Sequence, residues 1–188
     1  VLKRIQDLRS GDIAYGYLQA RPPFLEWFNG VQKDSTRRLM VFLYRDPRDF
    51  IISHIFYATQ MHLDHGLHRY YTQKLSTMEE RINAAIQGVE DNEETDSPLS
   101  SVFLKYENYL RWLSEPNVLC LKFEDLILQR EKALHTFLDF LACYGFSPQV
   151  SRAEAVNILA QAIIPNASGT FRRAKPGNWQ EYFTEGNK

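Results

Sequence analysis

The chain has 188 residues, of which 44% are hydrophobic and 13% aromatic, a globular composition that excludes an intrinsically disordered chain. Its formal net charge is −1, which argues against a general nucleic-acid binder and requires any anion site to be local. This length suits one hydrophobic core, so we expect a single domain over residues 1–188.

The cysteines and the apolar runs bear on the compartment. Cys120 and Cys143 both lie in apolar surroundings, and they form neither a disulfide framework nor a zinc-binding spacing. We therefore expect buried thiols in a reducing, cytoplasmic compartment. No apolar run approaches the length of a membrane span, and no signal peptide is visible. The chain starts with VLKRIQDLRS, which resembles the interior of a protein, and we expect a further N-terminal part before Val1.

The first predicted unit is a strand followed directly by a helix. Residues 38–45, RLMVFLYR, form a continuous apolar run, which is typical of a buried parallel strand with both faces covered. Asp46 fits the N-cap of the following helix and Pro47 its first position. Asp49 falls in the first turn, where a carboxylate favours the helix dipole. Apolar residues then recur at helical spacing, namely Phe50, Ile51, Ile55 and Ala58.

A second unit repeats this pattern. Residues 117–123, NVLCLKF, predict another buried strand, and residues 126–144 predict a helix that Gly145 can end. Strands that alternate with helices indicate an α/β fold with a mostly parallel sheet. Ligands in such sheets bind beyond the carboxyl ends of the strands, where Arg45 and the Glu124–Asp125 pair lie.

The remaining segments are helical or loop-like. Helices are predicted at residues 78–87 and 102–113, on either side of the acidic stretch 88–101, which we interpret as an exposed loop or a mobile flap. The segment from residue 165, PNASGTFRRAKPGNWQEYFT, has little periodicity but contains glycines, prolines, cations and aromatics. This composition is typical of a loop that wraps a ligand.

The charged joint after the first strand predicts a phosphate site. Free N–H groups at a helix N-terminus bind anions, and Arg45 adds a planar fork of donors that suits phosphate. Ser53 lies two turns further on, where its hydroxyl can add a donor. The cations of FRRAKPGNW predict a second phosphate clamp.

An alternative interpretation needs no ligand. Arg45 and Arg48 can simply pair with nearby carboxylates, and the basic segment can be a solvated turn that Trp179 anchors in the core. The candidate carboxylates are Asp46, Asp49 and Glu124.

Three segments together resemble the cytosolic-type sulfotransferases, which use 3′-phosphoadenosine 5′-phosphosulfate (PAPS). YRDPRDFIIS resembles the family's strand–helix signature, in which an arginine and a serine eight residues later hold the nucleotide 3′-phosphate; Arg45 and Ser53 keep that spacing. LKFEDLI resembles the family segment whose aromatic residue lies near the adenine, a place that Phe123 takes here.

The third segment, FRRAKPGNWQEYFT, resembles the family loop that closes over the same 3′-phosphate. By this resemblance Arg172 and Arg173 supply cations, and Ala174 supplies a backbone N–H where the family usually has glycine. The likeness extends over about residues 12–184, and HIFYATQMHLDHGLHRYY is similar to the bacterial branch of the family.

The resemblance implies a fold and a reaction. The fold is a parallel sheet flanked by helices, related to the P-loop nucleotide kinases. The reaction is transfer of a sulfuryl group from PAPS to a hydroxyl of a small-molecule or carrier-bound acceptor, with release of adenosine 3′,5′-bisphosphate. No nucleic acid, metal or membrane span is expected.

Two departures from the family pattern matter. The Pro-Lys-Ser-Gly-Thr-Thr loop that grips the 5′-phosphosulfate has no counterpart, and we expect this loop and its strand to precede residue 1. Tyr17 stands where the family usually has a catalytic histidine, which makes it the candidate catalytic residue. An unperturbed tyrosine is a weak base at neutral pH, so Tyr17 either orients the acceptor, or lines a pocket, or marks a lost activity.

The histidines offer two further interpretations. His54, His62, His65 and His68 have spacings that can share a helix face, but only Asp64 is nearby to support a metal. We favour a pocket-lining or surface role, with His54 or His62 as an alternative base. Two rival functions stay open, a degenerate sulfotransferase that only binds a nucleotide or a partner, and a nucleotide-dependent phosphotransferase.

Overall fold

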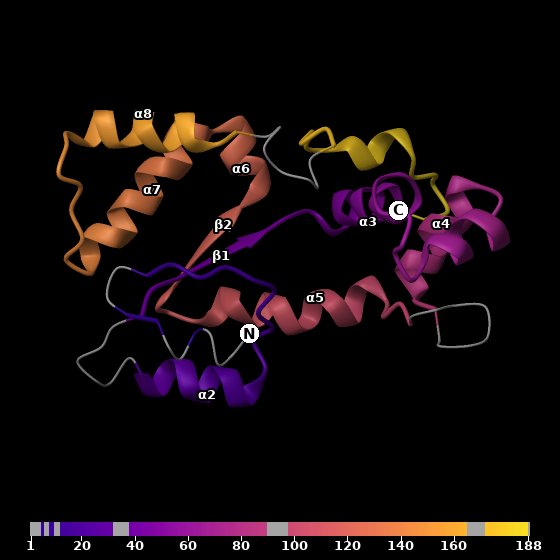
Figure 1. The fold of residues 1–188 in the computed structure, drawn as a ribbon, viewed down its shortest axis with the longest axis horizontal. Helices are drawn as coiled ribbons and strands as arrows, with labels where there is room; N and C mark the ends of the chain where they lie inside the picture. The colour runs from indigo at the N-terminus through magenta and orange to yellow at the C-terminus, as the bar shows by residue number, and fades with distance from the viewer. Residues whose placement is uncertain are drawn as a thin grey trace.

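The computed structural model describes residues 5, 8–9, 12–31, 38–89, 98–164 and 172–187. One end of the elongated molecule holds the strands with α2, α6, α7 and α8, and the other holds α3, α4 and the C-terminus, with α5 running between them (Figure 1). The elements are α2 (Pro22–Val31), β1 (Met40–Tyr44), α3 (Pro47–Phe56), η1 (Tyr57–Met61), η2 (Tyr70–Lys74), α4 (Met78–Gln87), α5 (Val102–Leu110), η3 (Arg111–Ser114), β2 (Val118–Lys122), α6 (Phe123–Leu128), α7 (Arg130–Cys143), α8 (Arg152–Ala162) and η5 (Asn178–Glu181).

The two strands confirm the predicted α/β class. β1 pairs with β2 in parallel, in a register that runs from Met40 opposite Val118 to Tyr44 opposite Lys122. Each strand starts later and ends earlier in the sequence than predicted. Because both carboxyl ends lie at the same edge of the sheet, the segments that leave β1 and β2 start side by side.

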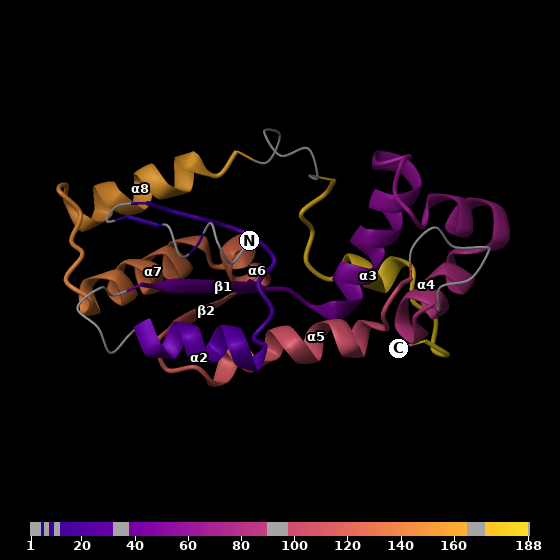
Figure 2. The ribbon, with the colours of Figure 1, turned by 60° about the horizontal axis from the view of Figure 1, so that its bottom comes forward.

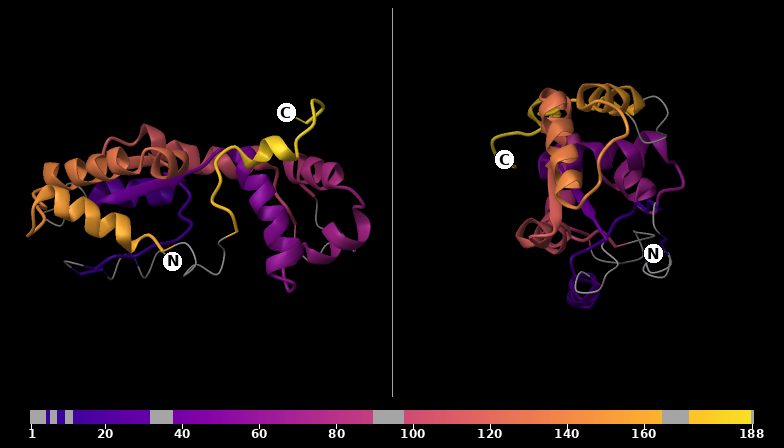
Figure 3. Two further views of the ribbon diagram at one scale, coloured as in Figure 1. Left: turned by 90° about the horizontal axis from the view of Figure 1, so that it is seen from above. Right: turned by 90° about the vertical axis from the view of Figure 1, so that its left-hand side faces the viewer.

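Helices lie on both sides of this sheet, with α7 and α8 on one side and α2 and α5 on the other (Figure 2). The face with Met40, Phe42 and Val118 packs into a buried cluster that includes Phe28 and Trp112. The opposite face of β1 is less covered. Its residues Val41 and Leu43 are 42% and 52% exposed, so the expectation that both faces are buried is wrong for β1. The view from above shows the same elongated arrangement, and the view from the left-hand side looks along the long axis (Figure 3).

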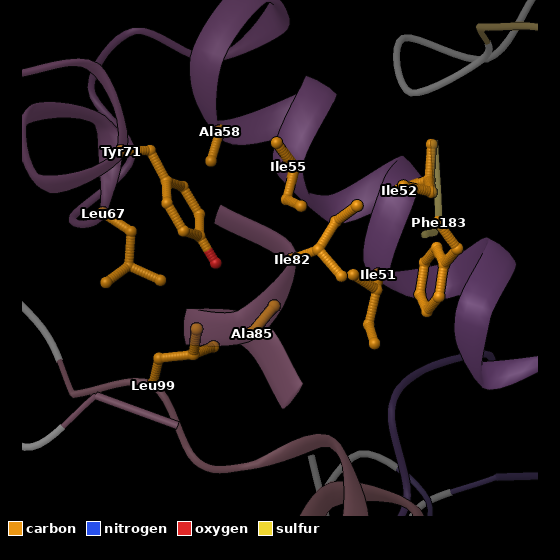
Figure 4. Packing of buried hydrophobic residues seen from close by; sticks show 10 residues of the cluster. All are labelled: Ile51, Ile52, Ile55, Ala58, Leu67, Tyr71, Ile82, Ala85, Leu99 and Phe183. Carbon is orange, nitrogen blue, oxygen red and sulfur yellow. The ribbon is translucent and has the colours of Figure 1, made fainter. Parts of the chain in front are cut away.

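The start of α3 follows the sequence prediction. The side chain of Asp46 caps the helix by accepting from the Arg48 N–H at 2.9 Å, and Pro47 occupies the first turn. The apolar side of α3 then packs into the largest buried cluster, with residues of α4 and the C-terminal segment (Figure 4). The members drawn there are Ile51, Ile52, Ile55, Ala58, Leu67, Tyr71, Ile82, Ala85, Leu99 and Phe183. This packing fixes the orientation of the polar side of α3.

The second strand–helix unit differs from the prediction in one respect. The expected helix over residues 126–144 is two helices, because α6 already starts at Phe123 and the chain breaks at Gln129, where φ is −134° and ψ is 43°. Gly145 ends α7 as predicted, with a φ of 84° and its N–H donating to the Ala142 carbonyl at 3.0 Å.

The helices between β1 and β2 begin and end mostly at the predicted residues. α4 has the predicted bounds and starts with a capping box formed by Thr77 and Glu80. α5 stops at Leu110 and continues as a 3₁₀ turn, and the π-helical segments η1 and η2 were not predicted. Most of the acidic stretch expected to form a flap, residues 90–97, lies outside the described residues. Its two ends meet in an antiparallel bridge between Val89 and Leu99.

The two cysteines are free, but only one is partly buried. Cys120 is half-buried in the sheet, whereas Cys143 at the end of α7 is exposed, so the expected burial is wrong for Cys143. Among the described helices, none is long and apolar enough to cross a membrane.

Two glycines provide a matched test of the backbone. At Gly88, φ is 90° and a Cβ atom would lie 2.8 Å from the Leu99 carbonyl oxygen and the Ser101 nitrogen, so we expect Gly88→Ala to lower the free energy of unfolding by about 2 kcal/mol. At Gly30 in α2 nothing lies within 4 Å of the added Cβ, so Gly30→Ala should raise it by about 0.5–1 kcal/mol. Urea unfolding measures both, and shifts of the same sign would contradict this account.

Candidate functional site

Arg45 lies at the joint between β1 and α3 and contacts three parts of the chain. Its guanidinium lies over the ring of Phe123, with Cζ 4.7 Å from the ring centroid. Nη2 lies 3.6 Å from Oδ2 of Asp49 and donates to the Lys175 carbonyl at 3.5 Å. Nε of Arg45 is buried and has no hydrogen-bond partner among the described residues. Arg45 and Phe123, predicted separately, are therefore neighbours. One donor of Arg45, its Nε, is unpaired in the part of the chain that the structure describes.

Neighbouring elements fix the backbone of this joint. The Asp46 N–H donates to Oε1 of Glu124 at 3.0 Å, which ties the start of α3 to the start of α6. The Tyr106 hydroxyl, from α5, donates to the Arg45 carbonyl at 3.1 Å. Burial and the nearby carboxylates raise the pKa of Tyr106, so this hydroxyl stays a donor. Contacts from α6 and α5 thus hold the joint from two sides and fix the backbone of Arg45.

Arg48 follows the alternative interpretation from the sequence. Its Nε and Nη2 donate to the two carboxylate oxygens of Asp46 at 3.0 and 2.7 Å. Burial raises the pKa of Asp46, but the hydrogen bonds and charge of Arg48 outweigh burial and hold this pKa below its ordinary value. The guanidinium of Arg48 also lies over Trp179, 3.7 Å from the ring centroid. Arg48 therefore contributes to packing, and it is already paired.

Arg172 lies at the other end of α3. Its guanidinium is 4.2 Å above the ring of Phe56, and its Nε is buried with no partner in the described part of the chain. Phe56 lies one turn beyond Ser53, so these two residues share a side of the helix with Asp49. Two arginines, each with an unpaired buried Nε, thus lie at opposite ends of one face of α3, and the half-buried Ser53 lies between them.

Arg173 and Lys175 do not face this helix surface in the structure. Both pair with Glu181, at 3.1 and 2.5 Å, and both are exposed. The hydrogen bond from Lys175, with the charge of Arg173, lowers the pKa of Glu181. Ala174, between the two cations, has a φ of 45°, in the left-handed region that is unfavourable for a residue with a Cβ. This conformation explains why glycine suits the position.

The sequence offered Asp49 as a partner of Arg45, which lies 3.6 Å away, but did not reveal its contacts with the C-terminal segment. Asp49 accepts hydrogen bonds from the Gly177 and Trp179 N–H groups at 2.8 and 2.9 Å, and it is only 1% exposed. Its position in the first turn of α3 indicated an interaction with the helix dipole. The sequence did contain one signal for a role of Asp49 in the site, because this charged residue lies four positions after Arg45, on the same face. Trp179 packs against the core cluster as the alternative interpretation predicted.

Tyr17 lies apart from this cluster of cations. It is 91% exposed, in the extended segment before α2. Burial, and to a smaller extent Tyr17, raise the pKa of Tyr109 on α5. Tyr109 is one turn from Tyr106, which contacts Arg45. A catalytic role for Tyr17 stays a prediction.

His54 is a half-buried titratable group next to Ser53. Its ring stacks on Phe50, with centroids 6.0 Å apart, and meets the ring of His65 edge-on at 5.2 Å. Burial, and then the charges of Lys105 and His65, lower the pKa of His54 to about 4. Its Nε2 is buried and lacks a partner within the described ranges. At neutral pH this imidazole is uncharged. No group of three or more His, Cys, Asp or Glu in the described part of the chain could hold a metal ion.

The strands pair in parallel between layers of helices, which makes this an α/β protein, and the buried Nε of Arg45 at the strand–helix joint has no partner among the described residues. The sequence family described as "Sulfotransferase domain" matches residues 31–188, so the chain belongs to the sulfotransferase domain family. This confirms the family that the motifs indicated. The narrower assignment to the bacterial branch stays a prediction. None of the curated proteins searched matches the chain significantly.

Solved structures show the shared fold. The crystal structure of mouse sulfotransferase SULT7A1 complexed with PAP is 18% identical, with a TM-score of 0.53, and the match covers 79% of this chain and 53% of that one. Two structures of retinol dehydratase, one with androsterone and inactive cofactor PAP and one with retinol and PAP, are 20% identical, with a TM-score of 0.53 and coverage of 79% and 43%. The chain therefore spans about half the length of these structures.

The lowered pKa of His54 predicts a pH-dependent stability. An unfolded histidine takes up its proton near pH 6.5, whereas folded His54 stays neutral down to about pH 4. Between these values the unfolded state binds more protons, so acidification lowers the free energy of unfolding, by up to about 3 kcal/mol. Urea unfolding between pH 7 and pH 4.5 measures this slope.

Two variants separate His54 from other groups that titrate in this range. His54→Phe keeps a ring against Phe50 but cannot take up a proton, so its slope should be shallower than that of the wild type. Thr59→Val removes a hydroxyl that donates to the Ile55 carbonyl at 2.8 Å, changes no group that titrates in this range, and should keep the wild-type slope. An unchanged slope in His54→Phe would contradict the assignment.

Proposed function

We propose that the chain is the nucleotide-binding part of a sulfotransferase that transfers a sulfuryl group from PAPS to an acceptor hydroxyl and releases adenosine 3′,5′-bisphosphate. The observation that carries the proposal is the pair of buried, unpaired Nε atoms of Arg45 and Arg172 on either side of Ser53. Buried donors without partners are rare in native proteins, and an absent anion is one physical explanation. Membership of the sulfotransferase domain family supports the same reaction.

In this proposal the face of α3 binds the 3′-phosphate. Arg45 and Arg172 donate from its two ends, Ser53 donates from the middle, and the backbone N–H of Ala174 donates from the C-terminal segment. Arg173 joins them if it exchanges Glu181 for the phosphate, since the present pair is exposed and readily replaced. The Arg45 guanidinium lies over the Phe123 ring, and this contact supports an adenine position beside the phosphate site.

The proposed reaction is an in-line displacement at sulfur. The acceptor oxygen forms a bond to sulfur while the bond from sulfur to the departing bisphosphate breaks, and a base takes the acceptor proton. Tyr17 is our proposed acceptor-side residue, which orients the hydroxyl or takes the proton. His54 is the alternative base, because its buried Nε2 is neutral and unpaired at pH 7.

The acceptor is proposed only as a hydroxyl of a small molecule or a carrier-bound intermediate. The retinol dehydratase structures contain retinol or androsterone, which are small molecules. We also propose that residues 1–188 fold as one domain. The free cysteines suit a reducing, cytoplasmic compartment.

A degenerate nucleotide-binding module is the second candidate function. The high exposure of Tyr17 favours it, because a catalytic side chain is expected to be enclosed near the reacting atoms. Both candidates bind the 3′-phosphorylated nucleotide and differ in turnover. Preference for ATP over adenosine 3′,5′-bisphosphate would instead favour a phosphotransferase.

Calorimetric titration with adenosine 3′,5′-bisphosphate and adenosine 5′-phosphate tests the phosphate site. We expect Arg45→Ala and Arg172→Ala each to weaken binding of the bisphosphate by about 1–3 kcal/mol, because each removes a charged hydrogen bond. Affinity for adenosine 5′-phosphate should hardly change. The exposed Arg111 in η3 provides a matched control, and Arg111→Ala should leave both affinities unchanged. Equal losses for both nucleotides would rule out the 3′-phosphate assignment.

A further inference from the structure

Asp49 is a buried carboxylate that joins two distant parts of the proposed site. Its Oδ2 accepts from the Gly177 N–H at 2.8 Å and its Oδ1 from the Trp179 N–H at 2.9 Å. Oδ2 also lies 3.6 Å from Nη2 of Arg45. One side chain therefore contacts both the arginine that follows β1 and the C-terminal segment that carries Arg172.

The backbone of the C-terminal segment is shaped to meet this carboxylate. Gly177 has a φ of 74°, a left-handed conformation that glycine adopts without a Cβ penalty. Its carbonyl accepts from the Gln180 N–H at 3.1 Å and so starts the 3₁₀ turn of η5. This turn directs the N–H groups of residues 177 and 179 to the same side, as in other backbone anion-binding turns. The Arg48 guanidinium over Trp179 covers the segment next to this contact.

A carboxylate at this position opposes phosphate binding by itself. Its charge lies next to Arg45, where it repels an incoming anion and competes for the guanidinium. Burial of the charge is also costly unless hydrogen bonds compensate it. The two amide hydrogen bonds provide this compensation only while the segment lies on α3. Because hydrogen bonds to a charged acceptor are stronger than those to a neutral one, this pair of bonds favours the docked position of the segment.

We propose that Asp49 is a positioning residue that docks residues 172–179 on α3 and so brings Arg172 to the phosphate that Arg45 binds. The inference rests on the proposed function, because that phosphate is the 3′-phosphate of the nucleotide. Asp49 does not contact the nucleotide. It acts through the segment and through the orientation of Arg45.

Asp49→Asn tests the proposal, because it keeps the shape of the side chain but removes the charge and one acceptor. Titration with adenosine 3′,5′-bisphosphate should show a loss of affinity of about tenfold or more. Adenosine 5′-phosphate should bind as to the wild type. The double variant Asp49→Asn with Arg172→Ala should bind the bisphosphate with nearly the affinity of Asp49→Asn alone, because Arg172 no longer reaches the phosphate once Asp49 is replaced.

The control variant is Asp139→Asn, which removes an exposed carboxylate paired with Arg152 and should not change either affinity. Losses that add in the double variant would show that Asp49 and Arg172 act independently, which overturns the proposal. Equal losses for both nucleotides would assign Asp49 a general structural role, which also overturns it.

Hydrogen exchange of the wild-type chain keeps the proposal testable if Asp49→Asn does not fold. The amides of Gly177 and Trp179 should be protected in the free chain and more protected with saturating adenosine 3′,5′-bisphosphate. Unprotected amides would overturn the proposal without any variant. If the wild-type chain binds no nucleotide, the proposed function fails. Even without nucleotide binding, docking by Asp49 would be supported if both amides are protected in the wild type and lose this protection in Asp49→Asn.

Discussion

The parallel pairing of β1 with β2 is the constraint on which the site depends. Because Tyr44 lies opposite Lys122, both strands end at the same level of the sheet. The next residues are Arg45 and Phe123, and the Arg45 guanidinium lies over the Phe123 ring. The hydrogen bond from the Asp46 N–H to Glu124 closes the same joint. A slip of one residue in the pairing would turn each strand over and separate these residues.

The parts of the fold that the sequence predicted are those with local physical causes. Asp46 and Pro47 mark the start of α3 because a cap and a fixed φ act within one turn. Gly145 ends α7 because glycine adopts a positive φ. The grouping of Arg45 with Phe123 was also predictable, since it follows from the carboxyl edge of a parallel sheet.

The remaining features depend on contacts between distant segments. Nothing near Asp49 in the sequence indicates that its partners are Gly177 and Trp179, and nothing near Arg173 indicates that it pairs with Glu181 rather than turning toward α3. The exposure of Val41 likewise depends on which helices cover the sheet, which an apolar run does not specify. These features are decided by tertiary packing and by competition among charges.

The carboxylates of the site explain how a chain of nearly neutral charge can present a local anion site. Asp46 pairs with Arg48, and Glu181 pairs with Arg173 and Lys175, so three of the nearby cations already have a carboxylate partner. Asp49 is largely satisfied by backbone amides and lies 3.6 Å from Nη2 of Arg45, while Nε of that arginine has no partner among the described residues. Among the described arginines, a buried and unpaired Nε is found at Arg45 and at Arg172. In the proposed function, the place of the phosphate site then follows from how the acids are distributed, because the total number of basic residues is matched by the acidic ones.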